Sequence, residues 1–148
     1  MSELLVALGW MGIFAPMAGG ALGSALGVAI AGSAAIGAML ETDSGYGRFV
    51  GMAAIPSSNV IYGIVVMFTL NRAVTPGNGG ALFAIGILTG IVLLYTAIWQ
   101  GRALAAAISA SKSKPEIFGL ALAPAAIVEG FAVFAFVFAL VLAGGIES

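Results

Sequence analysis

Long apolar stretches alternate with short polar segments along this chain. Four of the apolar stretches are long enough to cross a bilayer, which takes about 20 residues of helix. They cover residues 4–40, 49–70, 81–108 and 117–143. Backbone groups in lipid must form hydrogen bonds within their own segment, so each span is expected to be a helix. The pattern therefore predicts an all-α membrane protein with four transmembrane helices.

The polar segments between these spans are short. They cover residues 41–48, 71–80 and 109–116, so successive helices are expected to be antiparallel neighbours. The first stretch, 4–40, is longer than a simple span requires. We expect its ends to project from the bilayer or the helix to tilt.

The two halves of the chain share a sequence pattern. At an offset of 68 residues, Pro56 pairs with Pro124, and several small residues pair at the same offset. The proline pair carries weight because Ala and Val pairs recur by chance in so apolar a chain. We interpret residues 1–148 as one membrane domain that contains two tandem helical hairpins, 1–72 and 73–148.

The composition agrees with a membrane location and limits the chemistry. The chain is 61% hydrophobic and 7% charged, with a mean hydropathy of +1.17, whereas soluble domains carry about 25% charged residues. It has no Cys and no His, which removes thiolate chemistry and the commonest general base. Its Gly-rich stretches lack the spacings of nucleotide-binding loops. We expect no catalytic activity in this chain alone, no cofactor and no nucleic-acid partner.

The basic residues predict the orientation in the membrane, because Lys and Arg favour cytoplasmic loops. Among them, Arg72 lies in the middle loop, 71–80. The other four lie on the opposite side, and they are Arg48, Arg102, Lys112 and Lys114. We therefore expect loops 41–48 and 109–116 in the cytoplasm. Both termini, with Glu3 and Glu147, are then expected on the outside.

One charged side chain lies deep inside a predicted span. Glu129 is near the middle of residues 117–143, with twelve residues of the span before it. A charge at the bilayer centre costs at least ~2.5–3.5 kcal/mol, and such residues commonly mark ion or proton paths. We expect Glu129 to serve ion transport.

Other polar side chains are predicted at the same depth as Glu129. Asn59 and Gln100 are each 11 residues from the loop on the same side. At about 1.5 Å per residue, all three lie roughly 16–20 Å from their loops. Ser58 and Tyr62 flank Asn59 and share a helical face, since they are four residues apart. One carboxylate, two amides and two hydroxyls are thus expected to form a single site.

A proline precedes this level in each of the two even-numbered spans. Pro56 and Pro124 each remove one helical hydrogen bond and are expected to kink the span. The carbonyls of Met52 and Leu120 would then lack their usual partners. Such kinks shape a pocket or are simply tolerated in membrane helices.

Either a proton or Na⁺ would suit the predicted site. A protonated carboxyl needs one or two hydrogen-bond partners, whereas a hard cation prefers several oxygen ligands. The five oxygen-bearing side chains exceed the need of a proton and favour Na⁺ slightly. A hydrogen-bond network around a protonated Glu129 has the same sequence pattern, so both ions stay open at this point.

Small residues recur at every fourth position in the first and third spans, a spacing that lets helix backbones approach closely. They indicate either ordinary packing inside a four-helix protein or a crowded ring whose inner wall consists of these two spans. The residues are Gly19, Gly23 and Gly27 in the first span and Ala97, Gly101 and Ala105 in the third.

Three motifs together resemble a known family. They are Pro-Ser-Ser-Asn-Val-Ile-Tyr-Gly at 56–63, Trp-Gln-Gly-Arg at 99–102 and Val-Glu-Gly-Phe at 128–131. With the two hairpins, they resemble the proteolipid rotor-ring proteins, called K or c, of V-type and A-type ATPases. The resemblance implies a closed ring of identical subunits that turns against a stator subunit with an arginine. It also implies central-stalk subunits at the cytoplasmic loops, with ATP sites on other chains.

The resemblance also implies a set of ion ligands. In Na⁺-transporting members of that family, side chains from three spans and one backbone carbonyl hold the ion, and a Tyr closes the site. The corresponding positions are Ser58, Asn59, Gln100, Glu129, the carbonyl of Ile55, and Tyr62 as the closing residue. This chain departs from the family pattern by Ser in place of Thr and Asn in place of Gln.

Two other functions fit some of these features. A small proton-coupled multidrug exporter also has four spans and one buried Glu, although that Glu usually lies in the first span of a shorter chain. A structural or channel-forming membrane protein could carry Glu129 incidentally. The size of the oligomer distinguishes a ring from an exporter dimer.

Overall fold

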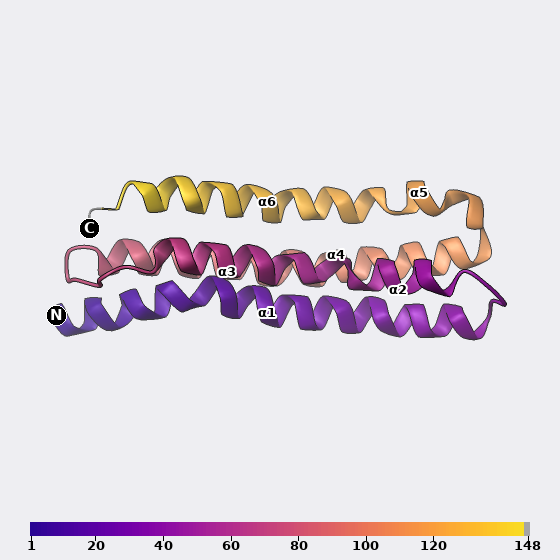
Figure 1. Ribbon diagram of the computed structural model, residues 1–148, viewed down its shortest axis with the longest axis horizontal. Coiled ribbons are helices and arrows are strands. Elements are labelled where there is room, and N and C mark those ends of the chain that lie inside the picture. The colour runs from indigo at the N-terminus through magenta and orange to yellow at the C-terminus, as the bar shows by residue number, and fades with distance from the viewer. Residues whose placement is uncertain (147–148) are drawn as a thin grey trace.

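The computed structural model describes residues 1–146, which form an elongated, all-helical bundle (Figure 1). It has four helical spans, of which two are continuous and two are interrupted. The continuous spans are α1 (Ser2–Leu40) and α4 (Gly79–Ser113). The interrupted spans are α2 (Tyr46–Ala54), η1 (Ile55–Ser57) and α3 (Ser58–Leu70), and then η2 (Pro115–Ile117), α5 (Phe118–Ala121) and α6 (Ala123–Gly144).

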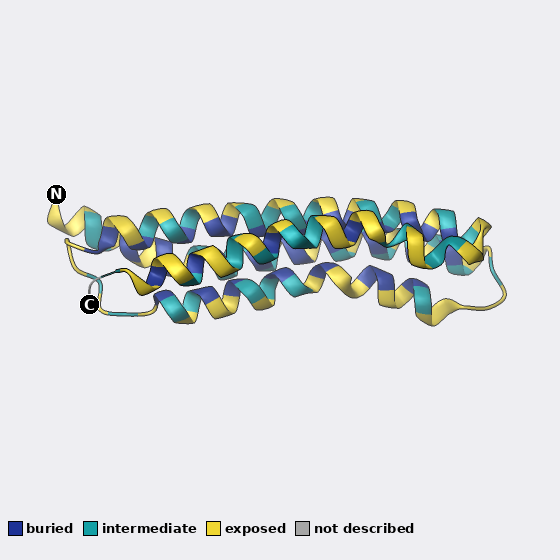
Figure 2. Ribbon diagram, turned by 90° about the horizontal axis from the view of Figure 1, so that it is seen from above, coloured by how far each residue is buried: buried dark blue, intermediate teal, exposed yellow. Residues whose placement is uncertain are grey.

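All four spans are long and apolar enough to cross a membrane. Large apolar side chains lie on their outer faces, and the buried positions form stripes that face the inside of the bundle (Figure 2). The chain is therefore an integral membrane protein, as the sequence predicts. With 39 residues, α1 is about 58 Å long at ~1.5 Å per residue, well beyond the ~30 Å hydrocarbon core.

The spans alternate in direction and form two hairpins, also as predicted. α1 and α4 run in the same direction and pack closely, and α3 packs against both of them. α6 packs against α3 and α4 and does not reach α1 within the described part of the chain. The last span of the second hairpin, α6, therefore lies on one side of the bundle (Figure 1).

The first and third loops lie at the same end of the bundle, and the predicted orientation depends on this arrangement. The connections after α1 and after α4 lie at one end, and the N-terminus lies at the other (Figure 1). A salt bridge of 2.7 Å joins Glu41 to Lys112 at the first end. At the second end, Arg72 donates to the carbonyls of Ala143 and Ile146, which ties α3 to the end of α6. Glu147, expected on this side, lies outside the described residues.

Glycines allow α1 and α4 to touch backbone to backbone. A Cβ added at any of these positions would collide with the main chain of the facing helix. Small residues at such positions are typical of close helix packing in lipid. The facing pairs are Gly12 with Gly86, Gly19 with Gly90, and Gly27 with Gly101. The expected close approach of the first and third spans is therefore present within a single chain.

Proline interrupts both even-numbered spans just before the polar level. Pro56 lies in the 3₁₀ turn η1, and Pro124 follows the short break between α5 and α6. As expected, the carbonyls of Met52 and Leu120 lack their usual partners, because proline at 56 and 124 has no N–H, but they are not left free. They accept from the backbone N–H groups of Ile55 and Leu122, because the chain tightens where the proline removes the ordinary bond.

A serine on α1 supports the break in the first hairpin. The Ser24 hydroxyl donates to the Pro56 carbonyl at 2.8 Å and accepts from the Val60 N–H at 3.1 Å. It therefore bonds to two backbone groups at the proline turn, of which the Pro56 carbonyl also accepts from the Ser58 N–H. The position 68 residues later is Val92, which has no hydroxyl, so the second hairpin lacks this support.

The third span extends further than the sequence pattern indicates. The apolar pattern predicts an end at residue 108, but α4 continues to Ser113. Polar side chains there stay compatible with a helix, since the Ser111 hydroxyl donates to the Ala107 carbonyl at 2.7 Å. Pro115 ends the helix by forcing the preceding Lys114 out of helical geometry.

We predict that Gly27→Ala destabilises the protein by about 1–3 kcal/mol, the usual cost of overpacking. The new methyl group would collide with the carbonyl of Ala97 and the ring of Pro56. Gly32→Ala on the same helix is the control, because its methyl would enter open space. Thermal unfolding in detergent measures both, and equal melting temperatures would contradict the packing described above.

We predict that Ser24→Ala also destabilises the protein, by about 1–3 kcal/mol, because the Pro56 carbonyl and the Val60 N–H each lose a hydrogen bond inside the bundle. Ser33→Ala is the matched control, since the Ser33 hydroxyl is exposed and bonds only to its own helix, at Ala29. Hydrogen exchange at the Val60 amide should accelerate in the first variant only. Unchanged protection of that amide would show that Ser24 does not support the break.

Candidate ion-binding site

Glu129 meets side chains from two other helices at the middle of the bundle. From α6, its Oε1 accepts a hydrogen bond of 2.6 Å from the Tyr62 hydroxyl of α3. Its Oε2 accepts a short hydrogen bond from the Gln100 amide of α4. Both carboxylate oxygens are therefore bonded, and the three predicted residues lie together.

Behind Gln100 the polar contacts continue into the bundle. The Asn59 amide donates to Gln100 Oε1 at 3.4 Å, and the Thr96 hydroxyl lies 2.9 Å from Asn59 Oδ1. These contacts form a chain of four side chains in the order Thr96, Asn59, Gln100 and Glu129. We call it the polar chain.

The two amides in the polar chain are the most deeply buried part of the site. Asn59 is 0% exposed and Gln100 is 1% exposed, whereas Glu129 and Tyr62 are half-buried. Two hydrophobic clusters flank this level, one toward each end of the bundle. Besides the polar chain, Gln100 Nε2 has the Ala125 carbonyl as an acceptor at 3.5 Å. Because the amides are buried, each unmade hydrogen bond would be costly.

The remaining two predicted residues lie beside the carboxylate. The Ser58 hydroxyl is buried and has no hydrogen-bond partner among residues 1–146. Ile55 lines a pocket of about 280 Å³ together with Gln100 and Glu129, and its carbonyl accepts from the Ser58 N–H. Ser58 therefore offers a free oxygen, whereas the Ile55 carbonyl already has one partner.

The charge of Glu129 is balanced by hydrogen bonds alone within the described residues. No Lys or Arg among residues 1–146 forms a salt bridge with it, and this part of the chain has no group of three or more His, Cys, Asp or Glu side chains that could hold a metal. The Arg102 guanidinium stacks on the Trp99 ring at 4.5 Å. A site with one carboxylate suits a single positive charge.

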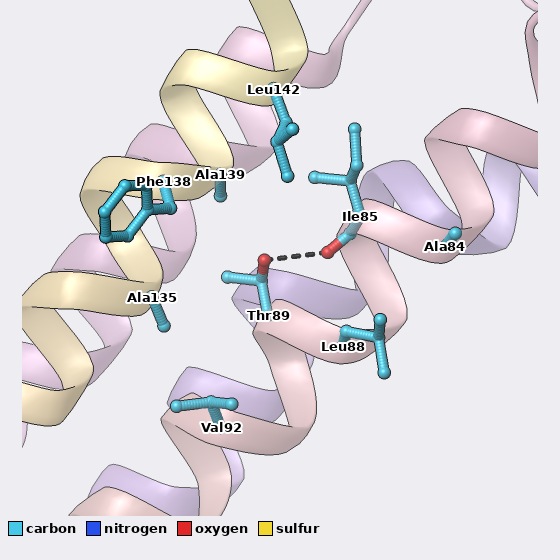
Figure 3. Close-up of a pocket in the computed structure, with 9 residues that line it drawn as sticks. All are labelled: Ala84, Ile85, Leu88, Thr89, Val92, Ala135, Phe138, Ala139 and Leu142. Atoms are coloured by element: carbon cyan, nitrogen blue, oxygen red, sulfur yellow. Dashed lines mark hydrogen bonds between the residues drawn. The ribbon is translucent and has the colours of Figure 1, made fainter.

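A second pocket lies between α4 and α6 (Figure 3). Its volume is about 310 Å³, and Thr89 is the polar side chain that lines it. The Thr89 hydroxyl donates to the Ile85 carbonyl of its own helix at 2.7 Å. No charged side chain lines this pocket.

Sequence reasoning missed two residues near the site, Ser24 and Thr96. Hydroxyls in helices commonly bond to their own backbone, so neither residue gives a distinct signal alone. Thr96 could have been found from its spacing, because it lies four residues before Gln100 and thus on the same helical face. Ser24 has no such relation to the other polar residues.

Comparison with known proteins gives two matches. The family model for the C subunit of ATP synthase matches twice, at residues 11–70 and 83–142. A-type ATP synthase subunit K of Methanocaldococcus jannaschii is 32% identical over 137 residues, which cover 90% of this chain and 62% of the relative. The chain thus spans less than two thirds of that relative's length.

The two family matches fall on the two hairpins, and each includes most of both spans of its hairpin. They confirm the duplication that the sequence pattern predicts. Proteins of this family form oligomeric rings in the membrane and are not themselves catalytic, which agrees with the expectation from sequence. The chain belongs to the family of ATP synthase C subunits.

Proposed function

We propose that this chain is the proteolipid ring subunit of a rotary A-type or V-type ATPase and carries H⁺ or Na⁺ on Glu129. The observation that carries the proposal is the carboxylate of Glu129 at mid-span, held by Tyr62 and Gln100 from two other helices. Membership of the family and the A-type relative supply the setting.

The site can exchange its ion because the carboxylate has two kinds of environment. On one side, Gln100 of the polar chain donates a hydrogen bond to it. On the other side is the pocket shared by Glu129, Ile55 and Gln100. An ion that enters there neutralises the charge of Glu129. A subunit with this neutral site can move past lipid at a much lower cost in free energy than one with an ionised carboxylate.

Na⁺ is slightly favoured over H⁺ as the transported ion. Ser58 contributes a buried oxygen with no partner in the described chain, and Tyr62 adds another oxygen beside the carboxylate. A proton needs neither additional ligand. To add an amide oxygen to a Na⁺ site, Gln100 would have to turn its Oε1 away from Asn59.

Identical subunits would form the ring, and a stator arginine would displace the ion from Glu129, since guanidinium pairs strongly with carboxylate. Large apolar side chains on all four spans provide the surface that neighbours and lipid would cover. In this proposal the end with loops 41–48 and 109–116 faces the cytoplasm and docks the central-stalk subunits. ATP hydrolysis or synthesis takes place on other chains.

The exporter alternative is not favoured. Its single Glu usually lies in the first span, whereas Glu129 lies in the last, and the family match covers both hairpins.

We predict that the detergent-solubilised chain is a large oligomer of fixed stoichiometry. The exposed apolar faces and the family both support a closed ring. Native mass spectrometry measures the number of subunits. Recovery of a stable dimer alone would favour the exporter and contradict the ring.

We predict that Glu129→Gln abolishes ion-coupled transport and leaves ring assembly intact. Glutamine keeps the size of the side chain but cannot carry the charge that a proton or Na⁺ balances. The measurement is ATP-driven ion uptake into vesicles that contain the complete ATPase complex.

Glu3→Gln is the matched control, because Glu3 is an exposed carboxylate at the far end of the bundle. It should transport at the wild-type rate. Normal ion-coupled ATP turnover in the Glu129 variant would refute the proposed role of this carboxyl.

A further inference from the structure

We propose that Thr96 is a positioning residue. It sets the donor-to-acceptor direction of the hydrogen bonds in the polar chain, and it lets that direction reverse when Glu129 binds its ion. This inference rests on the proposed function of Glu129. It adds a residue that neither the family resemblance nor the set of predicted ligands includes.

In the observed arrangement every donor of the polar chain points toward the carboxylate. Thr96 donates to Asn59 Oδ1, Asn59 Nδ2 donates to Gln100 Oε1, and Gln100 Nε2 donates to Glu129. An ionised carboxylate has no O–H, so it accepts hydrogen bonds but cannot donate them. This direction therefore fits an empty, ionised Glu129.

Thr96 has a second acceptor within reach. Its hydroxyl lies 2.8 Å from the Val92 carbonyl as well as 2.9 Å from Asn59 Oδ1. A hydroxyl has one hydrogen and two lone pairs. If the hydrogen goes to Val92, the oxygen of Thr96 is free to accept from Asn59 instead.

All of the hydrogen bonds in the polar chain can then reverse direction without any movement of a helix. Asn59 would donate to Thr96 and accept from Gln100, and Gln100 would direct its Oε1 at Glu129. An amide that rotates by a half-turn exchanges oxygen and nitrogen and keeps nearly the same shape. Each of the four side chains keeps a hydrogen-bond partner within the polar chain in both directions, and the bond given up is the 3.5 Å hydrogen bond from Gln100 Nε2 to the Ala125 carbonyl.

The reversed direction fits a loaded site. A protonated Glu129 has an O–H to donate, and Gln100 Oε1 would accept it. A bound Na⁺ needs oxygen ligands, and the same Oε1 would provide one. Burial of Asn59 and Gln100 enforces the coupling, because 0% and 1% exposure leave no bulk water to satisfy a misdirected amide.

Thr96→Val tests the positioning role, since valine has the shape of threonine without its hydroxyl. Carbodiimide reacts with protonated carboxyl groups, so its rate at Glu129 in intact rings reports how well the ionised form is stabilised. Without Thr96, the Asn59 oxygen loses the donor that fixes which end of the Asn59 amide faces Gln100, so the Gln100 N–H is held toward the carboxylate only by Glu129 itself and by a 3.5 Å contact with the Ala125 carbonyl. We expect Glu129 to label about 3- to 10-fold faster at fixed pH, the effect of one hydrogen bond.

Two controls separate this role from general damage. Thr96→Ser keeps the hydroxyl and should label at the wild-type rate. Thr89→Val removes the same kind of helical bond, from Thr89 to Ile85, seven residues away in the apolar pocket, and should also leave labelling unchanged (Figure 3). Wild-type labelling in Thr96→Val would overturn the inference and leave the proposed function standing. Failure of wild-type Glu129 to label would overturn both.

A second measurement on the wild-type ring tests the reversal directly and covers the case in which Thr96→Val does not fold. Gln100 is the sole glutamine of the chain, so cell-free synthesis with side-chain ¹⁵N-glutamine labels this amide alone. We expect its NMR signal to show a contact between NH₂ and the Glu129 carboxylate in empty rings, and its loss after loading with H⁺ or Na⁺. An NH₂–carboxylate contact that persists in loaded rings would contradict the reversal.

Discussion

A carboxylate inside a bilayer must be stabilised by donors that the protein supplies, because lipid supplies none. Here that requirement falls on Glu129, and it is met by Tyr62 from α3 and Gln100 from α4. Three spans must therefore reach one level in a fixed register. The glycine contacts between α1 and α4, the proline turn η1 and the polar residues behind Gln100 can all be understood from this demand.

Helix packing and buried hydrogen bonds both position the residues at the level of Glu129. Close contact between α1 and α4 creates a rigid pair of helices against which α3 is placed. Ser24 then satisfies the backbone at Pro56, one turn before Asn59. Because hydrophobic clusters lie on both sides of the polar level, the hydrogen bonds there act in a medium of low dielectric, where directed donors have large effects. The second hairpin lacks the serine and supplies the carboxylate.

The four spans and the shared depth of Glu129, Gln100, Asn59 and Tyr62 could be predicted, because hydrophobic length and residue counting from the loops set them. The helix end at Ser113 could not, since residues 109–113 are polar like a loop and only the geometry before Pro115 ends the helix. The partners of Ser24 and Thr96 depend on which helices pack together, and a hydroxyl in a helix gives no sign of that. The unpartnered Ser58 hydroxyl is likewise visible only in three dimensions.

The most direct measurement is carbodiimide labelling of the membrane-embedded ring across pH, with and without Na⁺, followed by peptide mapping. We expect modification at Glu129 that responds to the transported ion. Suppression by Na⁺ at fixed pH would identify Na⁺ as the cargo, and a response to pH alone would identify H⁺. Absence of modification at Glu129 under all of these conditions would contradict the claim that this carboxyl exchanges an ion.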